Sequence, residues 1–292
     1  MSITMNIQKK MKTVNSLSGG KTSSYIAANY PADYDVFSLV RIEHEASKFP
    51  DAKIRQEVED RIQAPFIATA EDDMIIYTML DLEQHIGRKI TWVTGKTFDQ
   101  ITTRKDKVYL PNKVQRFCTV EMKIEPMFYW WAENIGEPIE MRIGFRANET
   151  SRANNMLGRC NDDGLTVFKA TFEKHKDGRN KWVDVPYQKP RFPLIEDNIY
   201  KDKIELYWKD KSVRFAWMNN CVGCFHKSPM LIRKMFDKHP NKLEWFAQRE
   251  RDSVNNAKWR TDMTYDEIKK WNSQHELFDD DFNECDSGYC GL

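Results

Sequence analysis

Cys221 and Cys224, separated by two residues, form the most specific chemical pattern in this sequence. Gly223 lies between them, and a turn of this kind lets both sulfurs face one ion while its amides stabilise thiolate charge. The spacing indicates a metal site or a redox pair. Cys160 fits no ligand pattern, and we expect it to be an ordinary thiol.

A glycine-containing loop, SGGKTS at residues 18–23, is the second chemical pattern. Gly19 and Gly20 carry no Cβ, so the backbone there can turn sharply and approach a ligand closely. Lys21 and the two residues after it would open a helix, where unpaired amides and the positive end of the dipole favour phosphate. We therefore expect a phosphate-binding loop. The Walker A spacing is absent, and an ordinary turn capped by Ser23 is the structural alternative.

Alternating strands and helices position this loop. TVNSLS before it predicts a strand, the run after it predicts a helix that ends before Pro31, and YDVFSLVRI at 34–42 predicts a second strand. DAKIRQEVEDRI predicts an amphipathic helix and PFIAT a further strand. Such alternation is typical of an α/β fold with a doubly wound, mostly parallel sheet.

Two later regions depart from that alternation. Residues 165–188 alternate in period two on both sides of KDGRN, which predicts a β-hairpin inserted at the sheet edge, at about 160–190. From about Asn198 onward the chain is rich in aromatics at helical spacing. We expect an α/β nucleotide-binding domain over 1–195 and a helical C-terminal part over 196–292, which holds the cysteine pair and a cysteine-containing tail.

Composition limits the class of protein. The chain has 292 residues, 40% hydrophobic and 30% charged, with a formal net charge of +1, so its overall field does not favour bulk binding to nucleic acid or membrane. The longest apolar runs are too short to span a bilayer, and no signal peptide is evident, so we expect a cytoplasmic protein. Six cysteines in such a chain indicate reduced thiols, metal ligands or redox chemistry rather than a disulfide scaffold.

Five segments between residues 18 and 227 resemble one family in order along the chain, among them FPLIEDNIYKDKIELYW at 192–208. SGGKTS is similar to the PP-loop of the ATP pyrophosphatase superfamily, with Thr22 in place of the usual Asp. RFCTVEMKIEP at 116–126 resembles the Cys-Cys, two residues, Arg-Lys, two residues, Pro segment of the cluster-bearing reductases, although Thr119 and Met122 depart from it. IGFRANETSRA at 143–153 and NNCVGCFHK at 219–227 complete the likeness. The chain resembles the phosphoadenosine phosphosulfate (PAPS) reductase-like proteins of phage type.

The resemblance implies an adenine nucleotide alpha hydrolase-like fold and a set of site residues. Glu43 and His44, after the second strand, would contact the nucleotide, and a divalent ion such as Mg²⁺ is the alternative ligand there. Lys21 and Arg146 would act on the phosphate or sulfate. The implied nucleotide-binding residues are Ser16, Ser18, Gly19, Gly20, Lys21, Thr22, Ser23, Glu43, His44, Gly144, Arg146, Glu149 and Arg152.

The cysteines take their implied role from the cluster site of adenylylsulfate reductases. Cys118, Cys221 and Cys224 would hold an iron–sulfur cluster, with zinc as the alternative metal. The fourth ligand would be Cys290 or Cys285 from the tail, or one iron would stay open to a substrate or to sulfide. In PAPS reductases a cysteine near the C-terminus attacks sulfur, and Cys285 and Cys290 each match half of that Glu-Cys-Gly motif.

Three functions follow as hypotheses. The first is an enzyme that binds ATP or PAPS for adenylylation or sulfur transfer with a cysteine-held cluster. The second is a true PAPS or adenylylsulfate reductase that uses Cys285 or Cys290 as the nucleophile. The third is a non-catalytic nucleotide sensor or nucleic-acid-associated phage or defence protein, which the Thr in place of Asp favours. Nucleic acid, a thioredoxin-like protein and a second copy of the chain are the candidate partners.

Overall fold

A mostly parallel six-stranded sheet forms the centre of the computed structural model, which describes residues 10–271. The strand order is β5-β2-β1-β8-β10-β9, and only β9 runs antiparallel to its neighbour. The strands are β1 (Lys12–Leu17), β2 (Tyr34–Ser38), β5 (Ile90–Val93), β8 (Ile139–Arg142), β9 (Thr166–Lys174) and β10 (Asn180–Arg191). The model confirms the expected α/β class.

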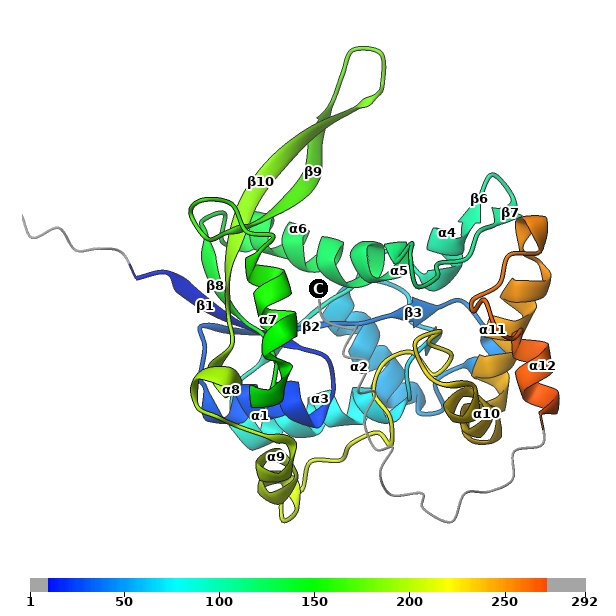
Figure 1. Cartoon of the computed structure of the whole chain (residues 1–292), viewed down its shortest axis with the longest axis horizontal. Coiled ribbons are helices and arrows are strands. Elements are labelled where there is room, and N and C mark those ends of the chain that lie inside the picture. Colours follow the sequence, from blue (N-terminus) through cyan, green and yellow to red (C-terminus); the bar gives the residue numbers. More distant parts are fainter. Residues whose placement is uncertain (1–9, 272–292) are drawn as a thin grey trace, which may run out of the picture.

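Helices cover both faces of this sheet, as Figure 1 shows. On one face, α1 (Lys21–Asn29), α2 (Ala52–Ile62), α3 (Met74–Ile86) and α9 (Lys201–Trp208) contribute to one hydrophobic core. On the other, α6 (Glu125–Asn134) and α7 (Thr150–Leu157) pack over β8 and β10 in a second core. The inner strands β1 and β2 are buried on both sides because each side has its own helical layer.

The helix positions define a reversal of the chain between β1 and β8. From β1 the chain passes through α1, on one face, to β2; the connection that returns to β8 passes through α6, on the opposite face. β1 and β8 are neighbouring parallel strands, so the segments that leave their carboxyl ends start side by side at this point. In open α/β sheets, ligands bind in the crevice at such a switch point.

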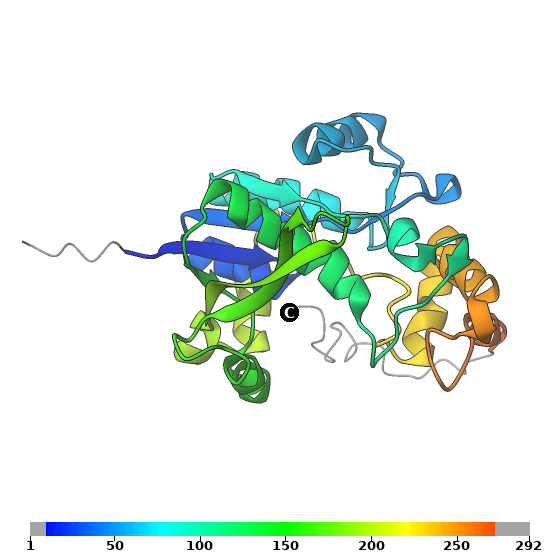
Figure 2. The same cartoon turned by 90° about the horizontal axis from the view of Figure 1, so that it is seen from above.

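The C-terminal helices form a third core beside the sheet. α10 (Pro229–Lys238), α11 (Pro240–Arg251) and α12 (Tyr265–Lys270) pack against α4 (Phe98–Thr102), β3 (Arg41–Ile42) and β4 (Ala68–Thr69). Seen from above in Figure 2, they lie to the right of the sheet, beyond the carboxyl ends of its strands. The third core therefore combines residues from both halves of the chain.

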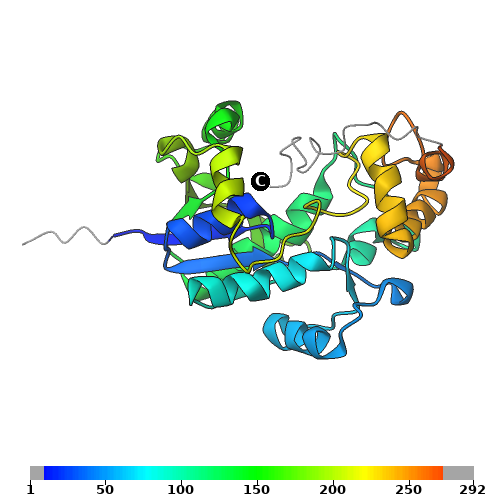
Figure 3. The ribbon, with the colours of Figure 1, turned by 90° about the horizontal axis from the view of Figure 1, so that it is seen from below.

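The structure corrects three details of the predicted elements. The second predicted strand breaks after Ser38, and the segment PFIAT supplies only β4, which pairs with β3 outside the central sheet. The hairpin is more than an edge insertion, because residues Gln188–Arg191 of β10 pair with β8 inside the sheet. α9 packs against α1, as Figure 3 shows from below, so the residues just after 196 belong to the first core.

The remaining short elements connect these layers. A π-helical segment, Val120–Ile124, follows α5 (Phe117–Thr119) and runs directly into α6, with Pro126 in the first turn of α6. This placement explains why Pro126 does not break the helix, since a first-turn residue needs no intrahelical amide donor. The other elements are β6 (Thr103–Arg104), β7 (Lys107–Val108), α8 (Pro193–Glu196) and the 3₁₀ turns Glu45–Ser47, Ala147–Glu149 and Val254–Asn256. No helix among residues 10–271 is long and apolar enough to cross a membrane.

Candidate functional site

The glycine loop lies at the carboxyl end of β1, at the switch point. Gly19 has φ of +79°, and a Cβ there would lie 2.5 Å from Cγ2 of the buried Ile75 on α3, so both conformation and space require glycine. Gly20 is the N-cap of α1 and provides no side-chain hydrogen bond to the helix. The first amides of α1 therefore lack a side-chain cap, which suits an anion.

Ser23 closes the loop from within. Its Oγ accepts a hydrogen bond from the amide of Ser18 at 3.1 Å and donates to the carbonyl oxygen of Gly20 at 3.1 Å. The hydroxyl oxygen of Ser18 lies 3.2 Å from Oγ of Ser23. Ser23 thus shapes the loop, but it does not cap α1 as the turn alternative expected, because the helix N-terminus has no side-chain hydrogen bond. Ser16, on β1, pairs in register with Val36 of β2.

Lys21 points towards α9. Its ammonium group forms an ion pair with Glu205, and its carbonyl oxygen accepts a 3.0 Å hydrogen bond from Nε1 of Trp208. Both side chains of the ion pair are about one-third exposed. An anion at the loop would therefore compete with Glu205 for Lys21, a relation that sequence spacing could not predict because 184 residues separate the two.

The end of β8 meets the loop directly. A Cβ on Gly144 would lie 3.4 Å from Cγ2 of Thr22, so the two strand ends are in contact through this glycine. Arg146 follows and is only 7% exposed. The segment IGFRANETSRA, predicted to contact the nucleotide, thus adjoins the glycine loop at Gly144.

Glu149 holds both predicted arginines. Its Oε2 accepts bonds from the amide and the Nε of Arg146 at 2.9 and 3.1 Å, and its Oε1 is paired with Arg152. The guanidinium of Arg152 also stacks 4.1 Å from the ring centroid of Phe145. Burial raises the pKa of Glu149, but the Arg146 amide and the two arginines outweigh that effect and leave it below its usual value.

The three predicted cysteine ligands within the described residues line one cavity. Cys118, Cys221 and Cys224 surround a space of about 30 Å³, together with Lys123 and His226. All three are thiols in the structure. Cys118 comes from α5 and the other two from the loop before α10, so the fold brings together residues that are about 100 positions apart.

Positive charge surrounds this cavity. Burial, with added repulsion from Arg116, Lys113, Arg260 and Lys227, lowers the pKa of His226 to about 4. The four cations favour a thiolate through their charge, whereas burial of the cavity disfavours any charged form. Lys123, a residue of the resembling motif, also forms a 2.9 Å ion pair with the fully buried Glu71.

Buried cations and a tyrosine hold the cysteine loop in place. Lys227, 1% exposed, donates to the carbonyl oxygens of Asn219 and Cys221 at 3.1 and 2.7 Å. Tyr265 Oη donates to the carbonyl oxygen of Gly223 at 2.7 Å, and Arg260 donates to that of Phe225 at 2.9 Å. Sequence reasoning assigned no role to these residues. Lys227 lies close after Cys224 in the sequence, but Tyr265 and Arg260 are distant from the cysteine pair and carry no local signal.

The glycine loop and the cysteine loop adjoin. A Cβ on Gly20 would lie 2.5 Å from Nδ2 of Asn219, two residues before Cys221. Lys227 in turn binds the carbonyl of Asn219. The glycine loop and the thiol cavity are therefore connected through one residue.

Glu43 and His44 occupy a different setting from the one predicted. They follow β3, outside the central sheet, and not its second strand. Glu43 accepts from Thr97 Oγ1 at 2.8 Å, and Nδ1 of His44 lies 2.7 Å from Ser47 Oγ. Burial lowers the pKa of His44. Within residues 10–271 no three His, Cys, Asp or Glu side chains form a group that could hold a metal ion, so no Mg²⁺ site is evident at residues 43–45.

The remaining cysteines are of two kinds. Cys160 Sγ donates to the carbonyl oxygen of Met156 at 3.7 Å, and burial raises the pKa of its thiol, as an ordinary cysteine would show. Cys285 and Cys290 lie outside the described residues.

No protein-family model, curated protein or solved structure matches the chain.

Proposed function

We propose that this chain is a PP-loop enzyme of the PAPS reductase-like kind, which binds an adenine nucleotide and uses it for adenylylation or sulfur transfer. The observation that carries the proposal is the contact between Gly20 and Asn219, which joins the loop at the switch point to the thiol cavity. An activated nucleotide and a sulfur-handling site need to be neighbours for sulfur to pass between them.

The residues at the switch point supply the groups that such a reaction needs. Uncapped amides of α1 and the ammonium of Lys21 would neutralise a departing pyrophosphate. Arg146 and Arg152 would stabilise the negative charge of the phosphate oxygens during attack at phosphorus, since each guanidinium group can bind two phosphate oxygens. Glu149 keeps both guanidinium groups at the end of β8 until the nucleotide binds.

In this proposal the cofactor of the thiol cavity is an iron–sulfur cluster, with one zinc ion as the alternative. A single zinc needs its thiolates to converge on one point, whereas each thiolate of a cluster binds a different iron. Cys118, Cys221 and Cys224 line one cavity. These cysteines would hold the cluster, whose chemistry when bound is to carry electrons or a sulfur atom. Lys227 and Arg260 would fix the loop around it.

Metal and sulfide analysis tests the cofactor. Protein purified without oxygen should contain iron and acid-labile sulfide and absorb visible light, and Cys221→Ser should lower all three. If the protein contains one equivalent of zinc and neither iron nor sulfide, the cysteines hold a zinc ion and not a cluster. Sulfite release from PAPS with thioredoxin would favour the reductase hypothesis over adenylylation.

Calorimetric titration of ATP and PAPS tests the nucleotide site. Lys21→Met should weaken binding roughly 10- to 100-fold, because it removes a charge-assisted contact to phosphate. Glu205→Gln should leave nucleotide binding intact or tighten it, because it removes the carboxylate that competes with phosphate for Lys21. If Lys21 serves only its ion pair with Glu205, the two variants will have equal effects, and the proposal will fail. Lys203→Met, an exposed change on the same helix, is the control.

A further inference from the structure

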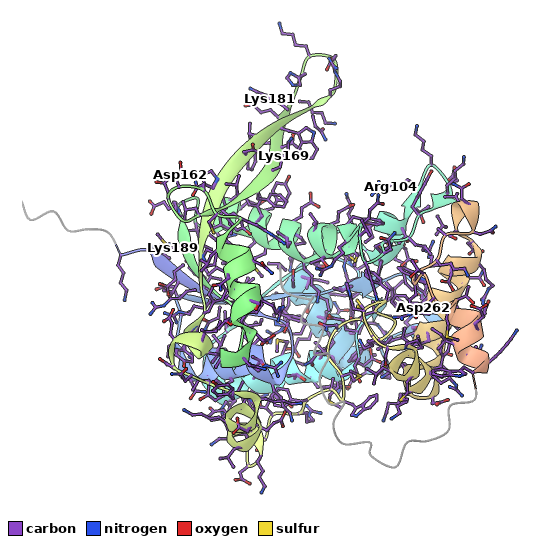
Figure 4. The ribbon with its side chains drawn as sticks, in the orientation of Figure 1. Arg104, Asp162, Lys169, Lys181, Lys189 and Asp262 are labelled. Carbon is purple, nitrogen blue, oxygen red and sulfur yellow. The ribbon has the colours of Figure 1, made fainter. Side chains whose placement is uncertain are left out.

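The hairpin β9–β10 borders a groove that the proposed nucleotide site does not use. The outer part of the hairpin stands clear of the molecular body in Figure 1. Between its foot and α4 lies a groove of about 490 Å³, lined by cations (Lys96, Arg104 and Lys169) and aromatic rings (Phe168 and Trp182). Figure 4 shows Lys169 and Lys181 along the hairpin and Arg104 on the β6–β7 side.

A second cavity continues from this groove. It has about 280 Å³ and shares Val120 and Phe168 with the groove, while Tyr187, Arg159 and Gln188 belong to it alone. This volume is close to the lower end of small-molecule pockets, roughly 300 Å³. Gln188 is 1% exposed, and its buried Oε1 has no hydrogen-bond partner. A buried amide of this kind favours a ligand with a polar edge.

The hairpin carries more positive charge than the chain as a whole. Between residues 169 and 181 there are five Lys or Arg and two Asp or Glu, against a net charge of +1 for all 292 residues. Lys181 and Arg179 form ion pairs with the two acidic residues of this segment, Glu173 and Asp177. Lys169, Lys174 and Lys176 have no ion pair with the described residues. Three cations are therefore available to a ligand.

The acidic residues of the groove are already compensated. Glu121 is bridged by Lys96 at 2.8 Å and by Arg104 at 3.3 Å. Burial raises the pKa of Glu125. The groove floor therefore repels an anion less than its composition suggests.

We propose that this groove binds single-stranded nucleic acid. Its backbone would follow the hairpin cations, and Trp182, 53% exposed, would stack on a base. One base would enter the cavity between Phe168 and Tyr187, with its polar edge against Gln188. A second copy of the chain fits less well, because protein interface cores are depleted in charge, whereas cations line this groove. The inference goes beyond the proposed function and does not depend on nucleotide binding.

Fluorescence anisotropy of labelled dT and U 12-mers, with the full chain and no ATP, tests this proposal. We expect binding that weakens as salt rises. Trp182→Ala should weaken it roughly 5- to 150-fold, as loss of one stacked base predicts. Lys169→Ala should lower the slope of log affinity against log salt by about 1. Lys203→Ala, an exposed lysine on α9, should change neither.

Gln188→Leu tests the cavity separately. It should change the preference among dT, dA and dC 12-mers, whereas Trp182→Ala should weaken all three. Absence of binding at low salt would overturn the proposal, as would equal affinities of the unmodified chain and Trp182→Ala. Sedimentation that shows Trp182-dependent dimers without oligonucleotide binding would also overturn it. Because ATP binding is measured through Lys21, either proposal can fail while the other stands.

Discussion

Single residues set how closely the parts of the site can approach. A Cβ on Gly223 would lie 2.5 Å from Cγ of Phe246, a ring that is fully buried in the third core. Neither the ring nor the cysteine loop can move away without losing packing, since Tyr265 also binds the carbonyl of Gly223. The small size of residue 223 is therefore a packing requirement as well as a feature of the cysteine turn.

Gly223→Ala should lower the free energy of unfolding by about 1–3 kcal/mol, the usual cost of overpacking a core. Urea denaturation measures this value. The matched control is Gly158→Ala at the end of α7, where φ is −66° and the new Cβ would make only an ordinary contact at 3.4 Å. That change should stay within about 0.5 kcal/mol. Equal effects of the two changes would mean that the cysteine loop is loosely packed.

Glu149 gives the site a predictable dependence on pH. Its pKa in the folded protein lies below the usual 4.5, so folding favours its charged form. The stability that it contributes is therefore complete above about pH 4.5 and is lost as pH falls through the folded pKa. Glu149→Gln should be least stable relative to the unmodified chain above about pH 5, and the difference should shrink on acidification.

Urea denaturation between about pH 3 and pH 7 measures this difference. The control is Glu133→Gln, an exposed carboxylate on α6 that forms no ion pair with the described residues. Its difference from the unmodified chain should stay flat. A flat difference for Glu149→Gln as well would show that its ion pairs with Arg146 and Arg152 do not form in solution.

At the scale of elements, the hairpin divides into a structural foot and an exposed outer part. Ala170 is fully buried and belongs to the second core, whereas Phe172 is 58% exposed and Trp182 is 53% exposed. Thr171 pairs with Trp182 in the register of the two strands. The hairpin can therefore be shortened at this pair without removing a core residue.

Replacing residues 172–181 by Asn-Gly, which favours a two-residue hairpin turn, should change the free energy of unfolding by less than about 1 kcal/mol. Oligonucleotide binding should weaken, because the cations of the outer hairpin are lost. Chemical denaturation and anisotropy on the same sample measure the two effects. Loss of cooperative unfolding would show that the outer hairpin supports the fold.

The sequence predicted the elements whose signals are local. Gly19 and Gly20 after an apolar run located the loop, KDGRN located the hairpin turn, and Pro31 located the end of α1. Contacts between distant residues could not be predicted, because periodicity says which face of an element is apolar and not which element covers it. The ion pair of Lys21 with Glu205 and the pairing of β10 with β8 are of this kind. Lys227 was missed because burial reversed the usual preference of lysine for solvent.

At the scale of the whole molecule, the three cores cross the predicted boundary at residue 196. The first core joins Tyr25 and Ile26 of α1 to Ile204 and Trp208 of α9. The third core joins β3 and β4 to the C-terminal helices. Two parts of the chain that complete each other's cores should unfold together. We therefore expect one calorimetric transition, with equal calorimetric and van't Hoff enthalpies, for the metal-free protein.

A fragment of residues 1–195 should therefore fail to fold alone. It lacks the α9 side chains that cover α1 and the helices that cover β3 and β4, so two apolar surfaces would face water. We expect no cooperative transition in its near-ultraviolet circular dichroism. A fragment of residues 1–210 keeps α9 and should still fail, because the third core stays incomplete. Co-expression of 1–210 with 211–292, a division within an exposed turn, should restore a soluble complex with the cooperative transition. Cooperative unfolding of 1–195 by itself would instead establish it as an independent domain, with the cysteine loop as an appended part.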